Sequence, residues 1–245
     1  MNPTLTLILV AAVTFAASYI QGATGFGFGI FSMIFLPHLL LYTEANVLSS
    51  ILSALTALVA AVLTFRKIHW KNIWFPVIGC LFSTYVAVSF MKGQSSQILS
   101  LLLGVALFLL SIYFFFFSGK IKIKPTWYAG LIAGALSGIL GGMFAIGGPP
   151  VVIYFMQSEE DFDRYFSTVS AYFVFSGMIS VSTKAAAGFI TVSVWIALAI
   201  SILTMIVGSY IGKRTKDRIN PNMVKKMVYG FMAISGLINI MTALA

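Results

Sequence analysis

The chain has 245 residues, of which 60% are hydrophobic and only 9% are charged, and its mean hydropathy is +1.00. This composition excludes an ordinary soluble domain and indicates a polytopic protein of the lipid bilayer. The formal net charge of +9 does not indicate a nucleic-acid partner, because the basic residues lie in short loops beside apolar segments, where positive charge sets membrane topology.

Apolar segments separated by short polar connections fill nearly the whole chain. They cover residues 5–21, 28–41, 46–65, 73–91, 98–117, 127–140, 143–156, 165–183, 189–211 and 224–244. A helix that spans the membrane needs about 20 residues, and three or four of these pieces, those beside two glycine-rich stretches, are too short. The sequence predicts an all-α polytopic membrane protein of 8–10 helical segments, in which each short pair is a hairpin of half-helices or two short tilted helices.

Two glycine-rich stretches interrupt these apolar segments, one in each half of the chain. The first contains Gln21, Gly22, Thr24, Gly25, Phe26, Gly27, Phe28 and Gly29. The second contains Ser137, Gly138, Gly141, Gly142, Ile146, Gly147, Gly148, Pro149 and Pro150. Irregular backbone at membrane depth is stable only where other parts of the protein bury it or where it faces a polar cavity. Paired breaks of this kind are typical of the binding site of a transporter, so we expect these residues to form the substrate site.

The basic loops predict the topology. Loops 66–71, 120–124 and 213–218 hold most of the Lys and Arg residues, and they share one side only if each glycine-rich pair crosses the membrane an even number of times. That side is then cytoplasmic, and only Lys92 and Lys184 lie opposite. We expect Lys184 to extend toward the membrane surface. Both termini then face away from the cytoplasm.

An odd number of crossings in each half inverts the second half relative to the first. Gly22 aligns with Gly138, and Gly25 aligns with Gly141. We therefore predict two inverted membrane repeats, 1–118 and 127–245, joined by a cytoplasmic loop at 119–126. The two breaks then approach the membrane midplane from opposite sides.

The chemistry of these segments favours an anion. Bare glycine amides and the positive ends of helices that start near Phe28 and Pro149 attract negative charge. No Asp, Glu, Lys or Arg lies in the middle of an apolar segment, and Cys80 is the only cysteine, so we expect no metal site and no cofactor. The polar groups left in the membrane are hydroxyls and amides, those of Gln21, Thr24, Ser18, Ser32, Ser49, Ser50, Ser53, Ser137, Ser170, Ser176, Asn46 and Asn239. They suit a small oxyanion, and Thr24 is expected to contact it.

Other interpretations of the same residues stay open. Ser18 with Gly22, and Gly138 with Gly134 and Gly142, have the spacing that lets membrane helices pack closely without any ligand, and such faces also permit a homodimer. A channel-like anion pathway or a permease for a non-sulfur organic anion would use the same site. An enzyme is not expected, because no segment pairs a nucleophile with a base.

The two glycine-rich stretches resemble those of the TauE/SafE family of sulfite exporters. The resemblance rests on residues 22–29, followed by Pro37, and on residues 137–150. It implies a multi-pass carrier of the bacterial inner membrane that exports sulfite, sulfonates such as sulfoacetate, or related organosulfur anions. It also implies that residues 21–29 and 138–150 supply the backbone of the substrate site.

Overall fold

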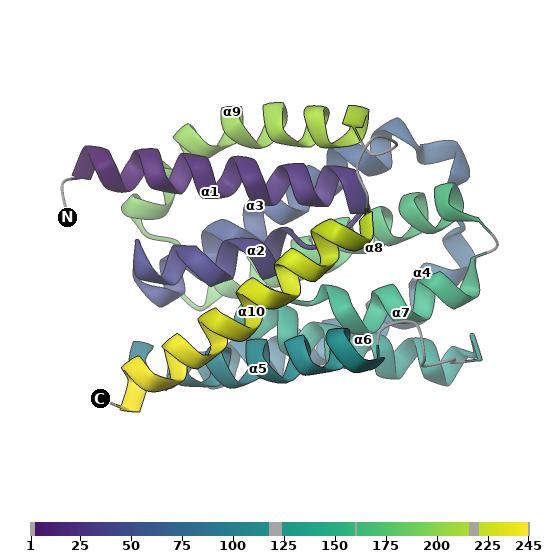
Figure 1. The fold of residues 1–245 in the computed structure, drawn as a ribbon. Helices are drawn as coiled ribbons and strands as arrows, with labels where there is room; N and C mark the ends of the chain where they lie inside the picture. Colours follow the sequence, from purple (N-terminus) through teal and green to yellow (C-terminus); the bar gives the residue numbers. More distant parts are fainter. Residues whose placement is uncertain (1–2, 118–123, 160, 216–220, 245) are drawn as a thin grey trace.

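The computed structural model describes residues 3–117, 124–159, 161–215 and 221–244. Within them the chain is a bundle of α-helices (Figure 1), which confirms the all-α fold class. The helices are α1 Pro3–Thr24, α2 Phe28–Phe35, α3 Tyr42–Leu63, α4 Trp70–Lys92, α5 Ser96–Phe117, α6 Trp127–Phe144, α7 Gly148–Ser158, α8 Phe162–Ala186, α9 Val192–Thr215 and α10 Pro221–Leu244. Two 3₁₀ turns, Leu36–His38 and Phe65–Lys67, follow α2 and α3.

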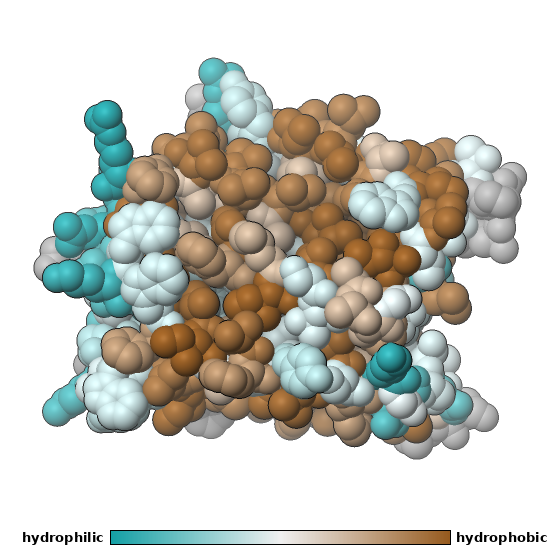
Figure 2. Space-filling view, turned by 180° about the vertical axis from the view of Figure 1, so that it is seen from behind, coloured by the Kyte–Doolittle hydropathy of each residue, from teal (hydrophilic) through white to brown (hydrophobic). Residues whose placement is uncertain are grey.

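The long helices have the length and composition of membrane spans. Among the described residues, α1, α3, α4, α5, α6, α8 and α9 are long and apolar enough to cross a bilayer. Large apolar side chains cover their outer faces, as at Phe82, which is 69% exposed, and Leu203, which is 70% exposed. Figure 2 shows this apolar surface across the middle of the molecule. The chain is a multi-pass membrane protein.

Each glycine-rich pair consists of one long and one short helix. The long members are α1 with 22 residues and α6 with 18, and the short members are α2 with 8 and α7 with 11. The prediction that three or four of these pieces are too short to span the membrane is wrong, because α1 and α6 both continue into the glycine-rich stretches.

The second helix break lies later than the sequence suggests, since α6 continues through its glycines to Phe144. A Cβ atom placed on Gly138 would lie 2.0 Å from Ser83 Oγ, and one on Gly142 would lie 2.9 Å from the Cβ of Ala87. Both glycines therefore let α6 pack closely on α4, as the small-residue interpretation predicts.

The register between the two halves follows from the helix ends. Residues 25–27 and 145–147 each separate a long helix from a short one. In this register Gly22 corresponds to Gly142, so the sequence-based pairing with Gly138 is wrong by one helical turn. The boundaries 1–118 and 127–245 stay predictions, and most of the loop 119–126 lies outside the described residues.

Contacts between loops show which segments share an end of the bundle. Gln97 Nε2 donates to the carbonyl of Ala243, so the start of α5 lies beside the end of α10, and both chain termini lie at that end (Figure 1). At the opposite end, Lys67 pairs with Asp163, which joins the α3–α4 connection to the first turn of α8. Figure 2 shows hydrophilic side chains gathered mostly at this opposite end. Several of the basic residues used for the predicted topology, Lys120, Lys122, Lys216 and Arg218, lie outside the described residues.

The helices of the two halves pack across one another. The main pairs are α1 with α9, α4 with α6, α3 with α8 and α5 with α10. Replacing each helix of the first half by its counterpart in the second half, α1 by α6 and so on to α5 by α10, and the reverse, gives the same set of pairs. Glycines bring several pairs into backbone contact, as at Gly22, where a Cβ atom would lie 2.5 Å from the carbonyl oxygen of Ser209 on α9.

Candidate functional site

The first break is a left-handed turn that its own residues hold closed. Gly25 and Gly27 have φ values of 84° and 106°, a conformation in which a side chain would be strained. The Thr24 hydroxyl lies 2.8 Å from the carbonyl oxygen of Ile20 and 2.6 Å from that of Phe26. This hydroxyl therefore stabilises the end of α1 and the turn that follows it.

The second break is held from outside by a neighbouring helix. Ala145 takes a left-handed φ of 57°, and its N–H and that of the next residue bond back to carbonyls of α6, which closes the helix end. The hydroxyl of Ser137 donates to the carbonyl of Gly147 at 2.5 Å, and the hydroxyl of Tyr172 on α8 donates to Ser137 Oγ at 2.9 Å. The buried chain from α8 thus fixes the start of α7.

The two breaks touch. A Cβ atom placed on Gly29 would lie 1.7 Å from the carbonyl oxygen of Ala145, so the first turn of α2 lies directly against the second break. Tyr42 and Asn46 of α3 both donate to the carbonyl of Met143 at 2.7 Å, which fixes the last turn of α6 beside them. Residues more than 100 positions apart in the sequence therefore form one centre.

A cavity of about 60 Å³ lies at this centre. One water-sized group needs about 10–15 Å³, so the cavity has room for about four to six non-hydrogen atoms. Seven helices and both helix breaks line it, and the lining residues are Gln21, Phe26, Gly27, Gly29, Ile30, Ser50, Ser53, Ala54, Cys80, Thr84, Ser137, Gly141, Ala145, Ile146, Gly147, Gly148, Phe173, Ser176, Gly177 and Ser180.

The structure divides the predicted site residues into two groups. Those that line the cavity are Gln21, Phe26, Gly27, Gly29, Ser137, Gly141, Ile146, Gly147 and Gly148. Those that do not line it are Gly22, Thr24, Gly25, Phe28, Gly138, Gly142, Pro149 and Pro150. The second group packs the breaks against their neighbours, as Gly25 does against Phe166 and as the fully buried Phe28 does in the core.

Several lining residues come from helices outside the glycine-rich stretches. Ser50 and Ser53 lie on α3, and Ser53 exchanges hydrogen bonds with Gln21, through its hydroxyl at 3.1 Å and its carbonyl at 3.0 Å. On α8, Ser180 is 7% exposed, and its hydroxyl has no hydrogen-bond partner among the described residues. A buried hydroxyl without a partner loses free energy, which a polar ligand would restore.

Lys184 contradicts two sequence predictions. It does not reach the membrane surface: its side chain is fully buried, and its ammonium donates to Ser50 Oγ at 2.7 Å and to the carbonyl of Gly141 at 3.3 Å. The centre of the bundle is therefore not free of charged side chains. The spacing along α8 could have indicated that Lys184 points toward the centre, because it lies one turn beyond Ser180 on the same face.

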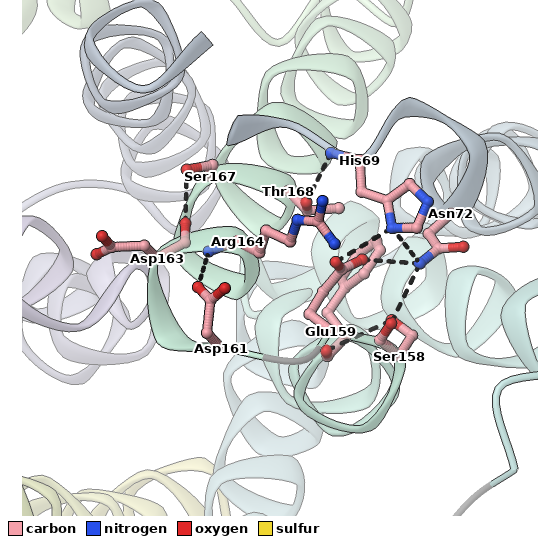
Figure 3. A network of polar contacts seen from close by, with 10 residues as sticks. His69, Asn72, Ser158, Glu159, Asp161, Asp163, Arg164, Ser167 and Thr168 are labelled. Carbon is pink, nitrogen blue, oxygen red and sulfur yellow. Dashed lines mark hydrogen bonds and ion pairs between the residues drawn. The ribbon is translucent and has the colours of Figure 1, made fainter. Parts of the chain in front are cut away.

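A second polar network lies at the hydrophilic end, where α7 is joined to α8 (Figure 3). Glu159 follows α7, and its carboxylate is only 1% exposed. It accepts a hydrogen bond from Asn72 Nδ2 at 2.8 Å and lies 3.2 Å from His69 Nδ1, while the N–H of His69 donates to Thr168. This network fixes the end of α7 to the start of α4, so both ends of the short helix are held by polar contacts.

The fold and the centre together define a multi-pass membrane protein in which two helix breaks surround a small cavity. The chain belongs to the sulfite exporter TauE/SafE family, whose model matches residues 10–238. The probable sulfite/organosulfonate exporter TauE of Cupriavidus necator is 24% identical over 238 residues, which cover 93% of this chain and 91% of the relative. No solved structure matches the chain. The family is one of exporters, and the bacterial relative indicates the plasma membrane.

Proposed function

We propose that the chain is a secondary transporter, acting as an exporter, of small sulfur-containing oxyanions such as sulfite or a sulfonate. The observation that carries this proposal is the single cavity lined by both helix breaks, because backbone groups at membrane depth need either protein or a polar ligand around them. Membership of the sulfite exporter family and the printed name of the Cupriavidus necator relative support the substrate class.

The donors around the cavity suit an oxyanion. The first N–H groups of α2 have no partner inside the helix, and Gly27, Gly29 and Ile30 line the cavity beside them. The hydroxyl of Ser180, which has no hydrogen-bond partner among the described residues, lies on another wall. Oxyanions accept several such hydrogen bonds at once, and the helix start adds a favourable partial positive charge.

The packing of the two halves supports alternating access as the mechanism. Each half contributes one break to the cavity, and each main helix pair has one member from either half. Rocking of one set of helices against the other would then open the cavity to one side and close it to the other, as in carriers built from inverted repeats. A homodimer stays a prediction.

Thermal unfolding of the detergent-purified protein tests the substrate class. The panel contains sulfite, sulfate, thiosulfate, sulfoacetate, taurine, acetate and chloride. A ligand that binds only the folded state stabilises it by about 2.7 kcal/mol at 100 times its Kd, so we expect stabilisation by sulfite or sulfonates and none by acetate or chloride. No stabilisation by any sulfur anion, in protein shown to be folded, would overturn the proposal.

Flux measured in proteoliposomes separates the two transport mechanisms. A carrier gives saturable flux that a second anion on the opposite side accelerates by exchange. Flux that rises linearly with concentration and shows no exchange would favour a channel-like pathway and exclude alternating access.

A further inference from the structure

We propose that Lys184 supplies the positive charge that balances the transported anion in the cavity. The inference rests on the proposed function and adds to it a specific residue outside both glycine-rich stretches. The evidence is the direction of the side chain, the nature of its present partners and the unsatisfied group beside it.

The direction follows from helix geometry. Phe173, Ser176, Gly177 and Ser180 all line the cavity, and Lys184 continues the same face of α8 by one more turn. Side chains on an α-helix lean toward its N-terminus, so the lysine extends back along α8 toward the cavity. Its ammonium accordingly reaches cavity-lining residues of α3 and α6.

The present partners of the ammonium are neutral. They are a hydroxyl oxygen of Ser50 and a carbonyl oxygen of Gly141, and the latter bond is long at 3.3 Å. Among the described residues, no carboxylate lies within ion-pair distance of Lys184. A buried charge without a counterion is costly, and inside a membrane protein it marks a functional position. An anion in the cavity would supply that counterion.

A second polar group at the cavity, a serine hydroxyl, is available to bind the same anion. Ser180 lies one turn before Lys184, and its buried hydroxyl has no partner among the described residues. An oxyanion that accepts from Ser180 and from the Lys184 ammonium would replace the long bond to Gly141 with a charge-assisted one. Ser50 then remains the resting partner of the lysine when the cavity holds no anion.

Charge-neutralising variants test this assignment. The purified full-length protein is titrated with sulfite and with sulfoacetate, and Kd is taken from the rise in Tm. We expect Lys184→Met to bind at least tenfold more weakly, Lys184→Arg to lose less, and Lys92→Met to bind like the wild type. Lys92 is the matched control, because it is an exposed lysine at the end of α4.

A purely structural role for Lys184 predicts a different pattern. If the lysine only ties α3, α6 and α8 together, Lys184→Met lowers Tm without anion. If it carries an unbalanced charge, the Tm of anion-free Lys184→Met is equal to or above that of the wild type, because the variant removes a buried charge. Lys184→Gln is a second neutral variant for the same test. If Lys184→Met and Lys184→Gln both fail to fold while Lys184→Arg folds, the inference is overturned.

The outcomes separate this inference from the proposed function. Equal stabilisation of the wild type and Lys184→Met, with Kd values within twofold, would overturn the role of Lys184 and leave the transporter proposal standing. Absence of stabilisation in the wild type by every sulfur anion would overturn both.

Discussion

Gly148→Ala places one methyl group beside the cavity-lining rings of Phe26 and Phe173. The Cβ atom would lie 3.4 Å from a ring carbon of Phe26 and 3.7 Å from one of Phe173, which are ordinary van der Waals distances, and Gly148 does not have a left-handed φ. The substitution also reduces the freedom of the unfolded chain. The ring of Pro149 crowds a Cβ atom on the helical residue before it, which opposes this gain, so we expect the stability of the anion-free protein to change by less than about 1 kcal/mol.

Anion binding should respond in the opposite direction. A methyl group takes about the space of one water-sized group, roughly a sixth to a quarter of a cavity of about 60 Å³. Overpacking a filled site costs about 1–3 kcal/mol, which corresponds to roughly 5- to 150-fold weaker binding. Kd for sulfite and sulfoacetate, measured by thermal unfolding and by flux in proteoliposomes, tests this expectation.

Two further glycines serve as controls. A Cβ atom on Gly230 of α10 has no atom within 4 Å, so Gly230→Ala should leave anion binding unchanged. Gly29→Ala should destabilise the protein itself, because its Cβ atom would lie 1.7 Å from a backbone oxygen of the second break. Wild-type affinity and flux in a folded Gly148→Ala protein would refute the assignment of this cavity as the substrate site.

Three other predictions concern the polar contacts of the two helix breaks and of the hydrophilic end. Thr24→Val should lower the free energy of unfolding by about 1 kcal/mol and change Kd less than twofold, because this hydroxyl bonds within the first break; weaker binding at unchanged stability would contradict that placement. Ser137→Ala should destabilise by about 1–3 kcal/mol and more than Tyr172→Phe, since it removes two buried hydrogen bonds; the reverse order in thermal unfolding would be inconsistent with the network. Asn72→Ala should also cost about 1–3 kcal/mol, whereas Lys67→Ala at the same end, in an exposed ion pair, should have no measurable effect on Tm.

Hydropathy and loop charge predict the fold class of this chain because each responds to the bilayer directly. Apolar length places the long helices, and the glycine-rich stretches indicate where the helices break. The exact breaks are not predictable in the same way. Gly138 and Gly142 pack α6 on α4, while Ala145, which is not a glycine, takes the left-handed turn. Composition does not distinguish a glycine that packs from one that turns, since both roles favour a missing side chain.

Lys184 illustrates a different limit of sequence reasoning. A lysine near the end of an apolar segment usually extends to the membrane surface, and local sequence contains nothing about what covers it. Here α3 and α6 cover the side chain of Lys184. Gly177 lets α8 approach α3 closely, because a Cβ atom on Gly177 would lie only 2.4 Å from the Cβ of Ala54. The helical spacing of Phe173, Ser176, Ser180 and Lys184 is visible in the sequence. Serines in membrane helices commonly bond to their own backbone, so this spacing does not by itself predict that the side chains face a cavity.

The two helix breaks are alike in backbone course and different in chemistry. At the start of α2, three residues in a row carry N–H groups that have no partner inside the helix. At the start of α7, Pro149 and Pro150 have no N–H group, so Gly148 is the first donor and the next comes a turn later. Backbone N–H groups for the proposed anion therefore come mainly from the first half, whereas the second half contributes the side chains of Ser180 and Lys184 on α8. A scaffold whose halves pack in the same way thus carries unequal groups around one cavity, and in the proposed transporter an anion would meet different partners on its two sides.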